Sequence, residues 1–402
     1  MAKQKILITT GIFPPDIGGP ASYGQTLARY LARDKAVVLI TYASVFKSAD
    51  DKKEPFRIIR VWRRWPKPLR QLIYLWRVFW LARPNFAKQN LGGLARQHDR
   101  ILVLNPVGAG LAVVWAAKLF KKKFVVRISG DKAWETAVNS GRTSLLIDDF
   151  QKVKKTGVIG LLHKFQSWVC READLVIAHS KYLAKLIEGW GVAPEKIKLI
   201  YNGVDFQPSA LSTEEARVKI GIAGNIILSA GRLAPWKGFR MLVKIMPQLL
   251  VINQFFRLVI VGDGPERSVL AAMIKNLRLD KKVYLVGKKS REELAVYLAA
   301  AELFVYNTGY EGFSHQILEA MTAGVPVVTT TAGGNPELIE QGENGFMVRY
   351  NDEFNLLEAI KTAWQNPTLR EHFSAAGKKT VQHFSARKLL VETKALLQST
   401  VK

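Results

Sequence analysis

The chain has 402 residues, a length that predicts two domains of about 200 residues each. Its composition, with 48% hydrophobic and 23% charged residues, excludes disordered, collagen-like and coiled-coil proteins. The single cysteine, Cys170, excludes a disulfide framework and a cysteine-based zinc site, and fits a reducing cytosol. The formal net charge is +26, and residues 1–205 hold 35 basic but only 15 acidic side chains, which points to nucleic acid, anionic lipid or a phosphorylated substrate.

The first half alternates apolar, strand-like segments with segments of helical period. Strands are predicted at 5–10, 36–41, 101–104, 124–128, 174–178 and 197–201, and helices at 22–33, 68–83, 108–120 and 181–189. The first strand follows the start of the chain directly, so we expect no signal peptide. Residues 101–117 carry no charge, but Pro106 and nearby glycines favour a strand, a turn and a buried helix over a membrane span.

The second half repeats this alternation. Strands are predicted at 226–230, 257–261, 282–286, 303–306 and 325–329, and helices at 239–251, 266–277, 291–300, 315–323 and 386–398. Near-continuous apolar strands separated by helices predict parallel sheets covered on both faces. We therefore expect an α/β protein with two Rossmann-like, doubly wound domains that face each other across a cleft and join within 203–223.

Two cations follow the first strand of the predicted second domain. After the strand at 226–230, Gly231 makes a turn, and Arg232 and Lys237 come before the next helix. Ligands of doubly wound sheets bind beyond the carboxyl ends of the strands, where an arginine fork and a lysine charge suit a diphosphate. The alternative is that both are solvated charges on a loop.

Two carboxylates surround the start of another predicted helix. Glu311 precedes the helix that opens near Ser314, and Glu319 lies about two turns into it. The free N–H groups of a helix start bind anions, and a carboxylate can accept hydrogen bonds from two neighbouring sugar hydroxyls. In the alternative, Glu311 only stabilises the helix start and Glu319 is a surface residue.

Other site types are less well supported. The strand followed by Gly262 and Gly264 suggests dinucleotide binding, but the third glycine is absent and the next strand is not followed by an acidic residue. The six histidines lack metal-ligand spacing, and no arrangement typical of a serine hydrolase occurs.

Several motifs in this order resemble those of the family 4 nucleotide-sugar glycosyltransferases. The motifs are Gly-Arg-Leu-x3-Lys-Gly-Phe from residue 231, Val-Gly-Asp-Gly-Pro from 261, and Glu-Gly-Phe-Ser-x4-Glu-Ala-Met-x2-Gly-x-Pro-Val-Val from 311. The segments 13–20 and 201–205 extend the resemblance more weakly into the first half. The family has the GT-B fold and retains anomeric configuration, which implies a retaining, metal-independent hexosyltransferase.

The resemblance also implies a domain division and roles for particular residues. Residues 1–205 would form the acceptor-side domain, 206–385 the nucleotide-sugar-binding domain, and 386–402 a helix that packs back on the first domain. Arg232 and Lys237 match the pair that binds the donor diphosphate, Glu311 the glutamate beside the donor sugar, and Glu319 the glutamate on the ribose. The remaining donor-binding matches are Gly18, Gly19, Val286, Gly312, Phe313 and Ser314.

The same resemblance implies a UDP- or GDP-sugar as donor substrate and no metal or other cofactor. Departure of the nucleoside diphosphate builds negative charge, which Arg232, Lys237 and a helix N-terminus can stabilise without Mg²⁺. The sequence contains no Asp-x-Asp metal motif, which agrees with this expectation.

The sequence departs from the family after the strand at 124–128. Many members carry a His-Asp pair there, but here Gly130 replaces the histidine and Asp131 matches the aspartate. Asp131 is the best side chain to replace the missing group, which makes it a candidate catalytic residue. The alternatives are that the leaving phosphate takes the acceptor proton and that Asp131 is a turn residue.

The basic first half suggests where the acceptor is found. Residues 52–100 hold 13 basic and two acidic side chains, and within 69–81 the side chains of Leu72, Leu75, Trp76 and Phe79 share one side of a helix. This pattern describes either an interfacial helix or a helix packed on the sheet. We expect a cytoplasmic protein, peripheral on the inner face of the membrane, with a glycan or lipid-linked saccharide as acceptor; the alternative is a soluble acceptor.

The charge also leaves a second class of function open. A basic nucleic-acid-binding protein would explain +26, but no nucleic-acid-binding module is recognisable, so no nucleic acid is expected as a partner. An inactive sugar-nucleotide-binding homologue is a further alternative, which the four intact residues Arg232, Lys237, Glu311 and Glu319 disfavour.

Overall fold

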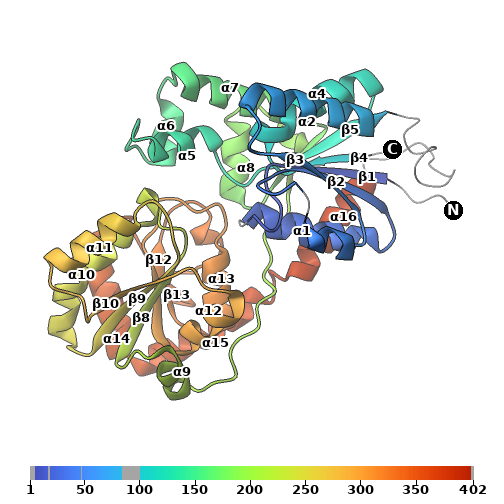
Figure 1. Ribbon diagram of the computed structural model, residues 1–402. Helices are drawn as coiled ribbons and strands as arrows, with labels where there is room; N and C mark the ends of the chain where they lie inside the picture. The colour runs from blue at the N-terminus through green and yellow to red at the C-terminus, as the bar shows by residue number, and fades with distance from the viewer. Residues whose placement is uncertain (1–4, 17–18, 47, 84–99, 400–402) are drawn as a thin grey trace. The chain divides into compact units, whose positions relative to one another are not determined.

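The computed structural model describes residues 5–16, 19–46, 48–83 and 100–399. The chain divides into two compact units (Figure 1), each built on one parallel sheet. The first unit is formed by Met1–Thr136, Val153–Ile200 and Leu389–Lys402, and the second by Ala137–Lys152 and Tyr201–Lys388. The segment 137–152 thus groups with the second unit, although it lies within the domain predicted for residues 1–205.

The first sheet has seven parallel strands in the order β3-β2-β1-β4-β5-β6-β7. They are β1 (Lys5–Thr10), β2 (Ala36–Ala43), β3 (Arg57–Trp62), β4 (Arg100–Val103), β5 (Lys123–Arg127), β6 (Leu175–Ala178) and β7 (Ile197–Leu199). The predicted α/β fold class is confirmed, but β3 was not predicted. This strand lies at an edge of the sheet and buries only Val61 fully, so it lacks the continuous apolar run of the central strands.

Helices cover both faces of the first sheet. In chain order they are α1 (Gly19–Ala32), α2 (Lys67–Ala82), α4 (Pro106–Phe120), α5 (Lys132–Asn139), α7 (Gly157–Glu172), α8 (Lys181–Glu188) and α16 (Ala386–Ser399). Helix α6 (Ile147–Lys152) and the end of α5 group with the second unit instead. The helices α2, α4 and α7 lie side by side on one face, and α1 and α16 lie on the other (Figure 1).

The last helix, α16, contributes to the core of the first unit. Its Leu389 and Leu397 are buried in the same cluster as Leu27 of α1 and Ile8 of β1. Lys394 also pairs with Asp34, with 2.9 Å between Nζ and Oδ2. The end of the chain therefore packs on the α1 side of the first sheet.

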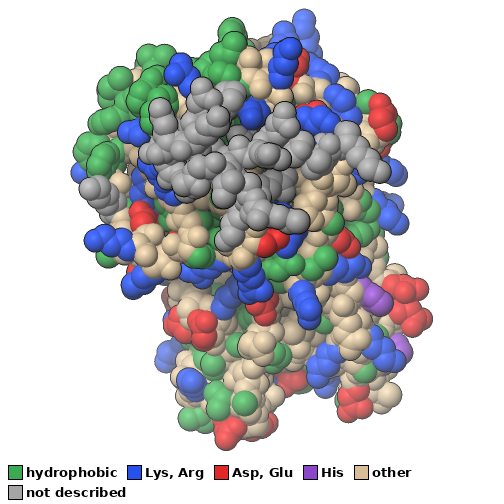
Figure 2. All heavy atoms as spheres, turned by 90° about the vertical axis from the view of Figure 1, so that its right-hand side faces the viewer, with side chains coloured by type: hydrophobic (Ala, Val, Ile, Leu, Met, Phe, Trp, Pro, Cys, Tyr) green, Lys and Arg blue, Asp and Glu red, His purple; other side chains and the backbone are tan. Residues whose placement is uncertain are grey.

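The helix α2 does not bury the stripe that its sequence outlines. Tyr74 and Val78 are buried against the sheet, together with Leu81 and Ala82, whereas Leu72 and Trp76 are 64% and 56% exposed. The alternative in which Leu72 and Trp76 pack on the sheet is therefore wrong. Hydrophobic side chains also gather beside lysine and arginine side chains at the upper edge of Figure 2. In the described part of the chain, no helix combines the length and hydrophobicity that a bilayer span requires.

The second sheet has six parallel strands in the order β10-β9-β8-β11-β12-β13. They are β8 (Asn225–Ala230), β9 (Phe256–Val261), β10 (Val283–Gly287), β11 (Ala301–Tyr306), β12 (Val327–Thr330) and β13 (Gly345–Val348). The edge strand β13 was not predicted. The strand order reverses between β8 and β11, and the loops after two such strands diverge and open a ligand site at their carboxyl ends.

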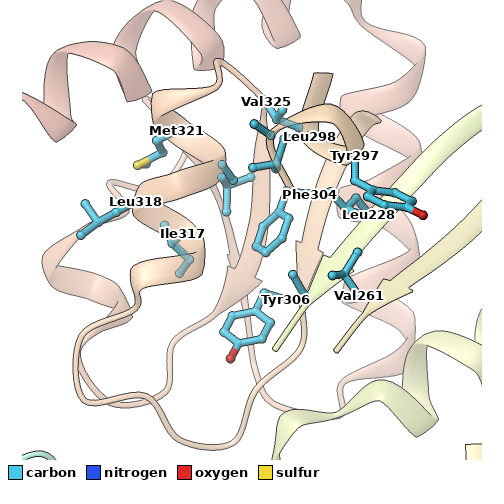
Figure 3. Close-up of a cluster of buried hydrophobic side chains, with 14 of the residues drawn as sticks. Leu228, Val261, Tyr297, Leu298, Phe304, Tyr306, Ile317, Leu318, Met321 and Val325 are labelled. Carbon is cyan, nitrogen blue, oxygen red and sulfur yellow. The ribbon is translucent and has the colours of Figure 1, made fainter. Parts of the chain in front are cut away.

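Helices cover this sheet as well. They are α9 (Thr213–Ile220), α10 (Phe239–Ile252), α11 (Arg267–Asn276), α12 (Arg291–Ala299), α13 (His315–Thr322), α14 (Glu353–Gln365) and α15 (Pro367–Val381). One core cluster joins Leu228 and Phe304 of adjacent strands to Leu298 of α12 and Ile317 of α13. Figure 3 shows this cluster, with Tyr306 at one end of it. The core thereby fixes the start of α13 beside the ends of β8 and β11.

Candidate active site

The loop that carries Arg232 rests on the glycine motif after β9. The backbone N–H of Leu233 donates to the carbonyl of Asp263 over 3.0 Å. A Cβ on Gly262 would lie 1.9 Å from the carbonyl oxygen of Gly231, so only glycine allows this approach. The motif therefore supports the Arg232 loop, and it was the segment considered above for dinucleotide binding. Arg232 itself is exposed.

Lys237 and Glu311 lie in direct contact. The Lys237 Nζ is 2.6 Å from Glu311 Oε1, and both side chains are largely shielded from water. The Tyr306 hydroxyl donates to the same oxygen over 2.8 Å, and the Lys237 ammonium lies 5.2 Å from the centre of the Tyr306 ring. Burial, followed by the nearby Glu311 carboxylate, raises the pKa of Tyr306 well above its usual value, so the phenol stays protonated and donates. Lys237 is therefore not merely a solvated loop charge.

Gly238 holds Lys237 close to the loop after β11. Its φ of +64° lies in the left-handed region, and a Cβ there would be 1.6 Å from the carbonyl oxygen of Asn307. The Asn307 amide donates to Asn351 Oδ1 over 2.9 Å and accepts from the Asn351 backbone N–H over 3.1 Å. Asn307 is buried, and its pairing with Asn351 fixes the backbone that Gly238 approaches.

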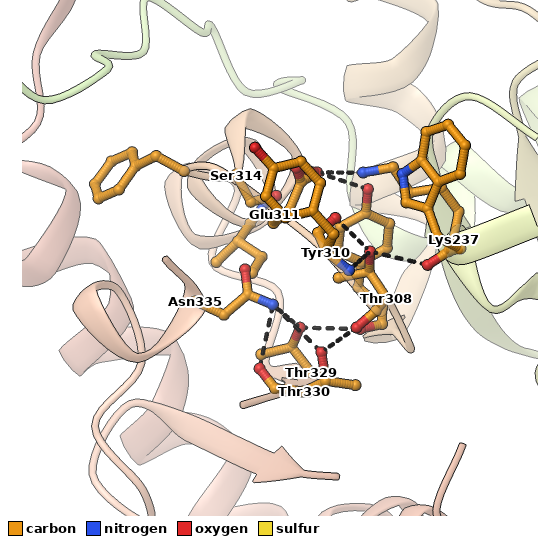
Figure 4. Close-up of polar contacts among 12 residues, drawn as sticks. Lys237, Thr308, Tyr310, Glu311, Ser314, Thr329, Thr330 and Asn335 are labelled. Atoms are coloured by element: carbon orange, nitrogen blue, oxygen red, sulfur yellow. Dashed lines mark hydrogen bonds and ion pairs between the residues drawn. The ribbon is translucent and has the colours of Figure 1, made fainter. Parts of the chain in front are cut away.

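A polar network supports the loop before α13 (Figure 4). Thr330 donates from its hydroxyl to the carbonyl of Thr308 over 2.6 Å, and Thr308 bonds the backbone of Trp236 and Tyr310. The Asn335 amide donates to the Thr330 carbonyl over 3.1 Å. Such side-chain bonds to backbone groups hold a loop in one conformation.

Backbone contacts fix Glu311 itself. The N–H of Gly334 donates to the Glu311 carbonyl over 2.8 Å, and a Cβ on Gly333 would lie 2.0 Å from that oxygen. The position of the carboxylate therefore depends on the segment after β12, to which the sequence analysis gave no role.

The N-terminus of α13 is capped and anchored. The Ser314 hydroxyl accepts from the Ile317 N–H over 3.3 Å. Phe313 is 3% exposed and packs against Tyr201 and Phe384, with ring centres 5.0 Å apart in each pair. Gly312 is buried beside it. These contacts hold the helix start, with its favourable field for anions, next to Glu311.

Glu319 is a buried carboxylate. It is 7% exposed and, among the described residues, makes no side-chain hydrogen bond or ion pair. Burial raises its pKa to about 7, an effect that Arg291 partly opposes. The alternative of a surface residue is therefore wrong. A buried carboxylate with open acceptor capacity suits a ligand that brings hydroxyl donors.

The other predicted donor-binding residues are more scattered. Val286 is half-buried near the carboxyl end of β10, next to Gly287, whose carbonyl accepts from the Gly262 N–H over 2.8 Å. Gly19 is the first residue of α1 in the first unit, and a Cβ there would meet no atom of the described, non-neighbouring residues within 4 Å. Gly18 lies outside the described residues.

Asp131 is fully buried in the first unit and caps α5. Its Oδ1 accepts from the N–H groups of Ala133 and Trp134 over 2.9 and 3.1 Å, and from the Gln166 amide over 2.7 Å. This geometry is that of a helix N-cap, which agrees with the turn-residue alternative. His163 lies close enough for Asp131 to affect its pKa, which burial lowers overall.

The structure thus brings some predicted residues together and adds others. Lys237 and Glu311 make contact, and Ser314 caps the helix that carries Glu319, whereas Asp131 and Gly19 belong to the first unit. Tyr306, the partner of Glu311, was not predicted from the sequence. The one signal in the sequence was a polar hydroxyl at the end of the apolar segment 303–306.

Two family models match adjoining parts of the chain. The model "Glycosyltransferase Family 4" matches residues 17–207, and the model "Glycosyl transferases group 1" matches residues 212–380. Together they follow the order of the motifs in both halves.

Curated proteins and a solved structure are similar to the chain. The N-acetylgalactosamine-N,N'-diacetylbacillosaminyl-diphospho-undecaprenol 4-alpha-N-acetylgalactosaminyltransferase of Campylobacter jejuni is 29% identical over 58% of this chain and 63% of its own length. The GDP-mannose-dependent monoacylated alpha-(1-6)-phosphatidylinositol monomannoside mannosyltransferase of Corynebacterium glutamicum is 26% identical over 95% of this chain and 94% of its own. Anabaena HepE in complex with UDP superposes with a TM-score of 0.77 and 22% identity, over 98% of this chain and 100% of HepE, which shows the shared fold.

Proposed function

The chain belongs to the family 4 glycosyltransferases with the GT-B fold, and we propose that it is a retaining, metal-independent hexosyltransferase. It moves a sugar from a nucleoside-diphosphate sugar to an acceptor hydroxyl. The observation that carries the proposal is the contact of Lys237 with Glu311 beside the capped start of α13. This places a cation, a carboxylate and a helix N-terminus together at the strand ends where the sheet order reverses.

The donor is a UDP- or GDP-sugar. The Anabaena structure contains UDP, and the name of the Corynebacterium relative specifies GDP-mannose, so both nucleotides occur among similar proteins. In this chain Glu319 accepts hydrogen bonds from the ribose hydroxyls, because its buried carboxylate has open acceptor capacity. Val286 and neighbouring backbone border the base.

The transfer step breaks the bond between the sugar C1 and the phosphate oxygen and forms a bond between C1 and the acceptor oxygen on the same face. Arg232, Lys237 and the start of α13 stabilise the charge that develops on the departing diphosphate. The acceptor proton moves to an oxygen of that phosphate, so no side-chain base is needed. Gly312, Phe313 and Ser314 place backbone N–H groups beside the phosphates and the sugar.

Glu311 and Asp131 have different roles in this scheme. Glu311, already bonded to Lys237 and Tyr306, lies beside the donor sugar and fixes the Lys237 ammonium. Asp131 is a positioning residue, because its buried Oδ1 is occupied by the start of α5. This assignment replaces the direct catalytic role considered for Asp131 above.

The acceptor is a lipid-linked saccharide at the cytoplasmic face of a membrane. The Campylobacter relative is named for a diphospho-undecaprenol acceptor and the Corynebacterium relative for a phosphatidylinositol mannoside. The excess of basic side chains in residues 1–205 agrees with an anionic surface and anionic acceptor. The family assignment does not favour nucleic acid as a partner.

A donor panel tests the proposal. The protein is incubated with UDP- and GDP-sugars, and release of nucleoside diphosphate is measured with and without lipid-linked acceptors, with and without EDTA. We expect release with one sugar nucleotide, unchanged by EDTA, and an α- or β-linkage matching that of the donor. Absence of both thermal stabilisation and turnover with every sugar nucleotide would contradict the proposal.

A further inference from the structure

The outward face of α4 is almost wholly apolar. Leu111, Trp115 and Leu119 recur every four residues along it and are 43%, 59% and 63% exposed. The alanines and valines between them are buried, so α4 is hydrophobic on its inner and outer sides alike. A helix that is hydrophobic all round is normally covered on every side.

The two helices beside α4 extend this face. On α2, Leu69, Leu72, Trp76 and Trp80 are exposed in one stripe, and on α7 the exposed Val158 and Leu161 are followed at helical spacing by the half-buried Phe165 and Trp168. Ring contact between Phe79 and Phe120, with centres 5.8 Å apart, joins α2 to α4. Helix α4 also packs beside α7, and Lys118 of α4 pairs with Glu172 of α7 over 2.8 Å. We call the outward sides of α2, α4 and α7 the three-helix face.

The charges around the three-helix face are almost all positive. The three helices contain six cations, Lys67, Arg70, Arg77, Lys118, Lys164 and Arg171, and one acidic residue, Glu172. Lys121 and Lys123, exposed just after α4, add to them. Two other basic side chains of residues 52–100 are engaged in ion pairs, because Arg60 is buried in a bidentate pair with Asp51 and Arg63 pairs with Asp16.

We propose that the three-helix face docks on an anionic bilayer, with its tryptophan and leucine side chains inserted at the headgroup boundary and its cations on the lipid phosphates. Exposed Trp and Leu surrounded by Lys and Arg is the composition of an interfacial surface. A surface that binds a protein would be expected to carry charges of both signs. The three-helix face carries almost only positive charges, which suit a negatively charged surface. The proposal builds on the lipid-linked acceptor of the proposed function, but it rests on side chains outside the donor site.

Vesicle binding tests the three-helix face directly. Co-sedimentation is measured with vesicles of phosphatidylcholine alone and with about one third phosphatidylglycerol, and neither donor nor acceptor is present. We expect binding to the anionic vesicles that weakens but persists at high salt, because salt screens the ionic contacts and not the apolar insertion. The double variant Trp76→Ser/Leu119→Ser should bind at least tenfold more weakly.

A matched variant controls for the loss of exposed apolar side chains in general. Val251 and Phe354 of the second unit are 88% and 71% exposed, so Val251→Ser/Phe354→Ser should bind vesicles as the unchanged protein does. Both double variants should keep their thermal stabilisation by UDP or GDP, which shows that they fold. In the variant Trp76→Leu/Trp80→Leu/Trp115→Leu, binding should persist while quenching of tryptophan fluorescence by brominated lipids falls strongly.

Three outcomes would overturn the proposal. They are no binding of the unchanged protein to anionic vesicles at low salt, equal binding by Trp76→Ser/Leu119→Ser, and a dimer in solution that this variant converts to a monomer. The last result would assign the face to a second copy of the chain. If the protein transfers sugar but does not bind vesicles, only the docking surface is refuted. If it binds vesicles but does not transfer sugar, only the proposed activity is refuted.

Discussion

The two units have the same architecture but carry their unusual residues in different places. In the second unit the polar motif residues lie at the carboxyl ends of the strands, and Lys237, Glu311 and Tyr306 satisfy one another. In the first unit the unusual side chains lie on the outer helices, where Trp76 and Trp115 are more than half exposed. A parallel sheet with helices on both faces therefore supports a buried site in one unit and an apolar surface in the other.

The largest effect is expected from removing the cations of the second unit. Arg232→Ala and Lys237→Ala should each lower the rate of transfer by about 10²–10³, or 3–4 kcal/mol, because each removes stabilisation of the leaving diphosphate. The measurement is kcat with a saturating donor. Lys244→Ala is the matched control, since Lys244 is an exposed cation paired with Glu353 on the same unit and should leave kcat unchanged. Full activity of the double variant Arg232→Ala/Lys237→Ala would refute the assignment.

The next effect concerns the backbone under Lys237. Gly238→Ala would place a Cβ 1.6 Å from the Asn307 carbonyl at a φ of +64°, whereas Gly221 has a φ of +68° and open space around it. We expect Gly221→Ala to lower the free energy of unfolding by about 1–2 kcal/mol, the cost of the left-handed conformation alone. Gly238→Ala should cost at least about 3 kcal/mol, because a clash is added. Urea unfolding measures both, and equal losses would show that the loop yields without strain.

Glu319 should affect nucleotide affinity and stability in opposite directions. Glu319→Ala should weaken the binding of free UDP or GDP by about 1–3 kcal/mol, the value of hydrogen bonds to a charged acceptor. In the free protein the pKa is raised from 4.5 to about 7, so the folded state binds the proton more tightly than the unfolded state and loses stability as pH rises between these values. Glu319→Gln should remove this loss, which amounts to at most about 3 kcal/mol at pH 8.

Calorimetry and unfolding at several pH values separate these effects. In the unchanged protein nucleotide affinity should rise as pH increases through about 7, because the ionised carboxylate accepts both ribose hydroxyls. In Glu319→Gln this rise should disappear. Equal affinity in the unchanged protein and in Glu319→Ala would eliminate the ribose role.

The smallest effect is expected in the first unit, at Asp131. Asp131→Asn keeps an oxygen that can accept from the N–H groups of Ala133 and Trp134, so both stability and transfer should change by less than about 1 kcal/mol. Asp131→Ala should lower the free energy of unfolding by about 0.5–2 kcal/mol through loss of the cap. A large loss of kcat in Asp131→Asn, with an unchanged free energy of unfolding, would instead support a catalytic role for Asp131.

Strand prediction depended on continuous apolar runs in the sequence and not on where a strand lies in its sheet. The central strands β1, β8 and β9 are continuous apolar runs, and their positions followed from sequence. The edge strands β7 and β10 were predicted although they are only partly buried, whereas β3 and β13 were missed, because Arg57 and Arg60 interrupt the apolar run of β3 and β13 is a run of only three apolar residues after Gly345. Helix α2 was predicted at nearly the right residues, but its inward face was not, because apolar side chains cover both of its sides.

The alternation of apolar strands and helices by itself determined the fold class, and the order of the glycine, cation and glutamate motifs determined the family and the candidate residues of a donor site. Only the tertiary structure decided how these residues act, because contacts between distant segments set their surroundings. Tyr306 meets Glu311 and Lys237 through the adjacency of β8 and β11, and the burial of Glu319 on α13 raises the proton affinity of its carboxylate. In the same way, Asp131 is a helix cap because Gln166 of α7 and the start of α5 enclose it, and the apolar stripe of α2 faces outward because the sheet takes the other side.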